Sequence, residues 1–144
     1  PWLTQLYTRL ICDEFYGTTP EHGYGYGQDE DQGQLGAWYV MAAMGLFDVQ
    51  GGTNITPSYQ IGSPKFRKIT IKLDPRYYSG KTLVIETENN APDHYYVQSA
   101  TLNGQPLEDC WFYRREIING GHLKLQMDST PNTRWGIASM PHSK

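Results

Sequence analysis

The chain has 144 residues, of which 38% are hydrophobic and 13% aromatic, a composition typical of a globular protein with a substantial core. Its 12 basic and 15 acidic residues give a formal charge of -3, and no Lys/Arg cluster recurs on any predicted face, so we expect no nucleic-acid partner. No apolar run approaches the roughly 18 residues that a membrane-spanning helix needs, so we expect no membrane partner either.

The start of the sequence and its cysteines carry two further expectations. The chain opens at Pro1-Trp2, without Met or a signal peptide and directly before an amphipathic segment, so we expect a piece of a longer protein. Cys12 and Cys110 lie far apart and make no metal-ligand spacing, and we expect both to be free thiols packed in a core.

Two helical patterns fill the first 45 residues. Apolar residues at three- and four-residue steps predict a helix over residues 2–16, stopped at Gly17. Residues 18–28 are typical of a loop, because glycines alternate there with tyrosines. A second helix is predicted over residues 31–44, ending at Gly45, and it is apolar on nearly every face. Such a helix packs on both sides, so we expect partner helices that this chain lacks.

Residues 51–144 change to period-two alternation, which predicts strands over residues 69–73, 83–87, 96–102 and 123–127. Asn103-Gly104 and Gly120-Gly121 predict hairpin turns between them. The predicted fold class is α+β, with a helical hairpin in residues 1–50 and an antiparallel β-sandwich-like module in residues 51–144. We expect Trp38 to be a core residue of the hairpin, and Trp111 and Trp135 to pack the β module.

Three consecutive acids, Asp29 to Asp31, stand where the second helix begins. One interpretation is helix capping, because Asp31 and Gln34 have the spacing of a capping box, worth about 1 kcal/mol. A calcium loop of the EF-hand type is excluded, because its sixth position needs Gly and its twelfth Glu, whereas Val40 is twelfth from Asp29. A phosphate-binding loop is excluded too, since no Gly-Lys-Ser/Thr follows the glycines.

Carboxylate catalysis is the other interpretation of these acids. A carboxylate at a helix N-terminus is stabilised in its charged form, which suits a general base and not a general acid. Inverting glycoside hydrolysis pairs such a base with an acid about 6.5–9.5 Å away across the sugar. Asp29 and Asp31 are only two residues apart, so they supply the base half alone. No other carboxylate of the chain presents itself as the acid half.

The same residues carry a family likeness. The stretch from Gln28 to Val40 strongly resembles the C-terminal part of glycoside hydrolase family 92, the calcium-dependent, inverting, exo-acting α-mannosidases abundant in gut Bacteroidetes. The likeness covers nearly the whole chain in the family's order, through Gly45-Leu46-Phe47 and residues 59–66, 99–106, 120–123 and 131–136. One departure is Gly25-Tyr26-Gly27-Gln28, where many members have Gly-Leu-Pro-Gly, so the linkage preference stays open.

This resemblance implies an enzyme much longer than the chain. Residues 1–50 would be the last helices of an (α/α)6 barrel, and residues 51–144 a β-rich end packed against the rest of the same polypeptide. It implies hydrolysis of α-mannosidic linkages of glycans, α-1,2 among them, with a periplasmic or extracellular bacterial location. The general-acid Glu and most ligands of the calcium would lie outside these residues, so we expect no metal site within the chain and no activity from it in isolation.

The resemblance also implies roles for single residues. Asp31 and Asp29 match the catalytic aspartates on the base side, with Asp31 orienting the attacking water. Tyr24, Tyr26 and Gln28 are candidate substrate-binding residues beside them, although the two tyrosines are as well placed to cover the barrel mouth. The alternative function is a carbohydrate-binding or structural β module, in which the acids serve only as a helix cap.

Overall fold

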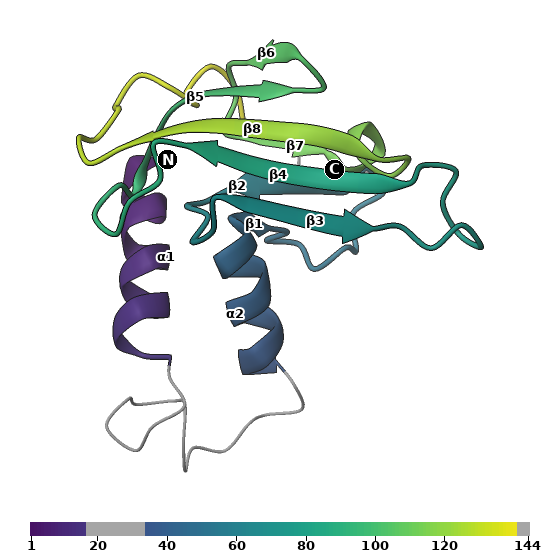
Figure 1. Ribbon diagram of the computed structural model, residues 1–144, viewed down its shortest axis with the longest axis horizontal. Coiled ribbons are helices and arrows are strands. Elements are labelled where there is room, and N and C mark those ends of the chain that lie inside the picture. Colours follow the sequence, from purple (N-terminus) through teal and green to yellow (C-terminus); the bar gives the residue numbers. More distant parts are fainter. Residues whose placement is uncertain (17–33, 141–144) are drawn as a thin grey trace.

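The computed structural model describes residues 1–16 and 34–140. Two helices project side by side from two layers of β-strands, with the end of α1 and the start of α2 farthest from the sheets (Figure 1). Within the described residues no helix is both long and apolar enough to cross a membrane. The α+β fold class predicted from the sequence is confirmed.

Helix α1 spans Trp2–Glu14, which confirms the first predicted helix and ends it two residues earlier. Its buried residues are polar or small: Gln5, Arg9 and Cys12. The large apolar side chains at four-residue steps face outward instead, with exposures between 36% and 58% for Leu3, Tyr7, Ile11 and Phe15. An amphipathic helix in a complete domain turns its apolar face inward. The apolar face of α1 therefore points away from the sheets, as in a helix that packs a second face against a further apolar neighbour.

Helix α2 spans Gln34–Met44 and ends at Gly45, as predicted. Gly45 adopts φ +75°, the left-handed conformation that glycine favours after a helix. Ala42 and Ala43 are buried, whereas Val40 on the same helix is 56% exposed. Trp38 is only half-buried, so the expected core role is met in part.

The smaller sheet has the order β1-β2-β7 and is antiparallel throughout. Its strands are Leu46–Phe47, Ser58–Ile61 and Trp111–Tyr113. None of the three was predicted, because each is too short to show alternation. Strand β1 follows α2 directly, which joins the helical hairpin to the β-rich part of the chain.

The larger sheet has the order β3-β4-β8-β5-β6. In chain order, these strands are β3 (Lys68–Lys72), β4 (Thr82–Glu88), β5 (Tyr96–Leu102), β6 (Gln105–Leu107) and β8 (Gly121–Asp128). The prediction of an antiparallel module is corrected here, because β4 and β8 pair in parallel from Leu83↔Gly121 to Glu88↔Gln126. The reason is topological: β8 returns to lie between β4 and β5, so its direction opposes β5 and matches β4.

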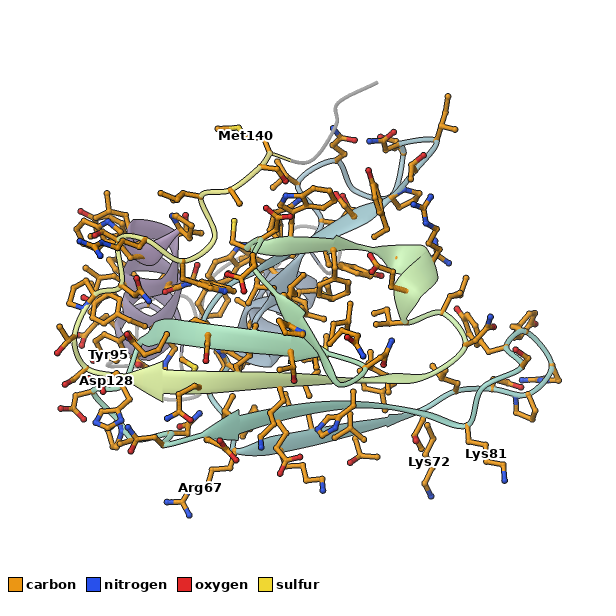
Figure 2. The ribbon with its side chains drawn as sticks, turned by 90° about the horizontal axis from the view of Figure 1, so that it is seen from above. Arg67, Lys72, Lys81, Tyr95, Asp128 and Met140 are labelled. Carbon is orange, nitrogen blue, oxygen red and sulfur yellow. The ribbon has the colours of Figure 1, made fainter. Side chains whose placement is uncertain are left out.

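Turn chemistry and edge charges fit this sheet. The predicted hairpin at Asn103-Gly104 is confirmed, since both residues have positive φ, 52° and 80°, between β5 and β6. Figure 2 shows Arg67, Lys72 and Lys81 pointing outward from the β3 side of the molecule. Cations at an edge strand discourage pairing with other chains.

Both sheets contribute to one core. Leu123, Leu125 and Met127 of β8 are fully buried at its centre, next to Ile85 and Phe112. Trp135 packs on this cluster and donates from Nε1 to the carbonyl of Leu107 at 3.0 Å. Trp111 is buried as well, so the packing role predicted for both tryptophans is confirmed.

The two thiols are free, as expected. Cys12 is buried and Cys110 is half-buried. Burial raises the pKa of the Cys12 thiol although Lys65 opposes the shift, and burial likewise raises the pKa of Cys110. Both side chains therefore stay protonated at neutral pH, which makes them packing groups and poor nucleophiles.

Candidate functional site

The predicted site residues fall in one segment of the chain. Asp29, Asp31, Tyr24, Tyr26 and Gln28 all lie outside the described residues, so their roles stay predictions. The structure does place what flanks that segment on both sides: the last turn of α1 with Tyr16, and the first turns of α2. We call these two helical ends the frame; Figure 1 shows them on the side of the molecule away from the sheets.

Aromatic rings join the two helical ends. The Tyr16 ring stacks on Trp38 at 5.2 Å between centroids with an interplanar angle of 19°. It also lies 5.2 Å from the ring of Tyr39, tilted by 30°. Aromatic pairs of this kind contribute about 0.5–1.5 kcal/mol beyond the burial of their area. Tyr16 therefore ties the end of α1 to α2 immediately before the candidate segment begins.

Charged groups join the same helices to the β-rich part. The Lys65 ammonium forms an ion pair with Asp13 near the end of α1. Arg9, one turn earlier, places its Nε 3.8 Å from the same carboxylate. The Lys65 Nζ also lies 5.8 Å from the centroid of the Tyr39 ring on α2, within the range of a cation–π contact. One lysine between β2 and β3 thus contacts both helices.

The pKa of Lys65 reflects this setting. Partial burial lowers it, but the hydrogen bond and the charge of Asp13, with smaller help from Tyr39 and Cys12, outweigh burial and raise the pKa above its usual value. Lys65 is therefore fully charged at neutral pH.

Backbone hydrogen bonds hold the segment around Lys65 against both helices. The Gly62 amide donates to the Gly45 carbonyl at 2.8 Å, and the Lys65 amide donates to Ala43 at 3.0 Å. From α1, Arg9 Nη1 donates to the Pro64 carbonyl at 2.8 Å, while its guanidinium lies 5.3 Å from the ring of Tyr95. Figure 2 shows Tyr95 at the end of the molecule where α1 stands.

Gln5 extends this interface to the larger sheet. Its Oε1 accepts a hydrogen bond from the Val97 amide at 3.1 Å, although the two residues are 92 positions apart. The buried Gln5 and Arg9 therefore explain the polar inner face of α1: they satisfy backbone groups of the β-rich part. Sequence reasoning missed Gln5, Arg9, Asp13 and Lys65, because no local pattern links residues so far apart.

Two cavities flank α2, and Trp38 and Phe47 line both. One holds 340 Å³ between the helices and the first two strands. The other holds 390 Å³ beside Asp48, Tyr59 and Arg114. Their walls are mostly apolar, and their described linings contain none of the predicted site residues.

The described part of the chain offers no metal centre. Residues 1–16 and 34–140 contain no group of three or more His, Cys, Asp or Glu side chains that could hold a metal ion. No catalytic step is therefore assigned to a metal on the described residues.

Comparisons with known proteins identify the class of enzyme. The model of the glycosyl hydrolase family 92 catalytic domain matches residues 1–129. A protein of Arthroderma benhamiae, described as an uncharacterized secreted glycosidase, is 33% identical over 110 residues, which are 75% of this chain and 13% of that protein.

Solved structures agree. The family GH92 inverting mannosidase of Bacteroides thetaiotaomicron is 40% identical with a TM-score of 0.83, and the match covers 99% of this chain and 18% of that one. A family GH92 alpha-mannosidase of the same organism is 30% identical with a TM-score of 0.82, covering 96% and 17%. The matches all fall within one class of proteins, the glycoside hydrolases. More narrowly, this chain belongs to glycoside hydrolase family 92, and it spans less than a fifth of the length of these relatives.

Proposed function

We propose that this chain is the C-terminal part of an α-mannosidase that hydrolyses α-mannosidic linkages of glycans, α-1,2 among them, with inversion. Its share of the reaction is the base side: Asp31, with Asp29 beside it, orients and deprotonates the attacking water. The observation that carries the proposal is the 40% identity to an inverting mannosidase across 99% of the chain. The position of both acids directly before α2 supports it, because a helix N-terminus favours an ionised carboxylate.

The rest of the same polypeptide is the proposed partner of both helices. Leu3, Tyr7, Ile11 and Val40 expose between 36% and 58% of their surface, and two mostly apolar cavities flank α2. Several exposed apolar side chains along one helix are typical of an interaction site. Helices of an (α/α)6 barrel preceding Pro1 would cover it, and would bring the general acid that the 144 residues do not supply.

Calcium is proposed for the full-length enzyme, with most of its ligands outside this chain. We expect treatment with a chelator to abolish mannosidase activity of the full-length enzyme and added calcium to restore it, whereas magnesium does not. The measurement is the hydrolysis rate of an aryl α-mannoside after dialysis. Full activity of enzyme shown by elemental analysis to be metal-free would contradict the proposal.

Inversion gives a direct test of the mechanism. Attack of water on the face opposite the leaving group yields β-mannose first, which then equilibrates with the α-anomer. Proton NMR of an α-1,2-mannobiose digest in its first minutes should therefore show the β-anomeric signal ahead of the α-anomeric one. Initial release of α-mannose would refute the inverting mechanism. The same experiment on α-1,3- and α-1,6-mannobiose measures the linkage preference.

A secreted location, periplasmic or extracellular in a bacterium, is proposed on the description of the Arthroderma benhamiae relative as secreted.

The alternative function, a carbohydrate-binding or purely structural β module, predicts that residues 51–144 act without the acids. Calorimetry of the full-length Asp31→Asn enzyme and of a further variant altered in the β module, against mannose oligosaccharides, separates the two.

A further inference from the structure

Lys65 connects three parts of the chain: helix α1, helix α2 and its own segment between β2 and β3. The segment around Lys65 is bonded to the end of α2: the amides of Gly62 and Lys65 donate to the carbonyls of Gly45 and Ala43. Its side chain reaches Asp13 on α1 and the ring of Tyr39 on α2. No role in binding or chemistry has been assigned to it so far.

We propose that Lys65 is a positioning residue for hydrolysis: it fixes the end of α1 relative to α2, the two helices between which the proposed catalytic aspartates lie in the sequence. This inference rests on the proposed function, since the role of Asp31 is itself proposed. The β-rich part of the chain thereby acquires a part in catalysis without touching the substrate.

The ion pair of Lys65 with Asp13 is partly buried. Its side chain is 22% exposed and that of Asp13 33%, so solvent and salt screen the pair less than an open surface pair. Asp13 has a second cation, Arg9, whose Nε is 3.8 Å away and whose side chain is 5% exposed. Removal of Lys65 leaves a half-buried carboxylate with only this longer contact, which favours movement of the last turn of α1.

The aromatic contacts transmit such a movement. Tyr16, two residues beyond α1, stacks on Trp38 and Tyr39 of α2. A shift at Asp13 therefore changes the register of Tyr16 against α2, and both ends of the frame move. A displacement of about 1 Å in a catalytic group costs on the order of a hundredfold in rate. A partial displacement should cost about tenfold.

The test uses the full-length enzyme with three variants. Lys65→Met keeps the length of the side chain and removes its charge, Asp13→Asn removes the partner charge, and Lys65→Arg restores a cation. Arg76→Met is the matched control, because Arg76 pairs with Asp74 at 2.5 Å but its side chain is 77% exposed. For each variant we measure kcat, KM and amide hydrogen exchange in peptides covering residues 10–16 and 34–40.

Lys65→Met and Asp13→Asn should each lower kcat about tenfold with KM within about twofold, and should raise exchange in both peptides. Lys65→Arg should recover most of kcat, and Arg76→Met should match the unaltered enzyme. Unchanged exchange in both peptides, or raised exchange with unchanged kcat, would overturn the proposal. Full activity of an Asp31→Asn enzyme would refute only the base assignment, because exchange at the helical ends is measured without reference to catalysis.

Discussion

Replacing Asp31 with Asn in the full-length enzyme should lower kcat for an aryl α-mannoside about a thousandfold, in the middle of the range for loss of a general base. The amide of Asn has nearly the shape of the carboxylate but accepts no proton from water at neutral pH. Binding of the mannoside uses other contacts, so KM should stay within about threefold. The measurement is steady-state kinetics with a chromogenic mannoside at the pH optimum.

The control for this prediction is a carboxylate elsewhere on the chain. Asp93 has a side chain that is 75% exposed, and Asp93→Asn should leave kcat unchanged. The Asp31→Asn enzyme should unfold at the same temperature as the unaltered enzyme, which separates lost chemistry from lost structure. An Asp31→Asn enzyme with more than a tenth of the original kcat would show that Asp31 is a helix cap and not the base.

The Gly45→Ala substitution should destabilise the unit that contains α2 and the smaller sheet by about 3–5 kcal/mol. Two effects add. An alanine Cβ would lie 2.4 Å and 2.5 Å from the Cγ and Cδ of Pro64, closer than any real contact, and Pro64 is itself buried. The φ of +75° adds strain for any residue other than glycine. The measurement is the unfolding free energy, or the thermal midpoint where unfolding is irreversible.

Gly51→Ala separates the two effects. Gly51 has a similar φ of 61°, but an alanine Cβ there would meet no atom within 4 Å. This control should lose only about 1 kcal/mol, the cost of the left-handed conformation. Equal losses for the two variants would mean that the segment around Pro64 yields, and that it does not hold α2 as tightly as its hydrogen bonds to Gly45 and Ala43 indicate.

Local patterns were sufficient for much of the fold. Strand β5 was predicted with the bounds that the structure shows, Tyr96–Leu102, because apolar and polar residues alternate over its second half before a turn that needs positive φ at Asn103 and Gly104. The end of α2 at Gly45 followed from the same chemistry. Strands of two to four residues, such as β7 with three consecutive aromatic residues, carry no period and were missed.

The rest of the structure depends on contacts that no local pattern encodes. The parallel pairing of β4 with β8 is decided by the whole core, since the alternation of either strand fits both directions. The ion pair of Lys65 with Asp13 joins residues 52 positions apart. The inward polar face of α1 reverses the usual rule, because Arg9 and Gln5 bond to backbone groups of the β-rich part. The acids of the candidate site were proposed from the sequence alone, and both their role and their geometry stay predictions.

The place of β8 in the larger sheet also determines when the module can be completed during synthesis. The last strand of the sheet in sequence is the one that pairs with both β4 and β5. Until residues 121–128 leave the ribosome, both of those strands present an open edge, and the core lacks Leu123, Leu125 and Met127. Open edges are templates for pairing with other nascent chains. A chain that ends before residue 121 should therefore aggregate more readily than the complete module.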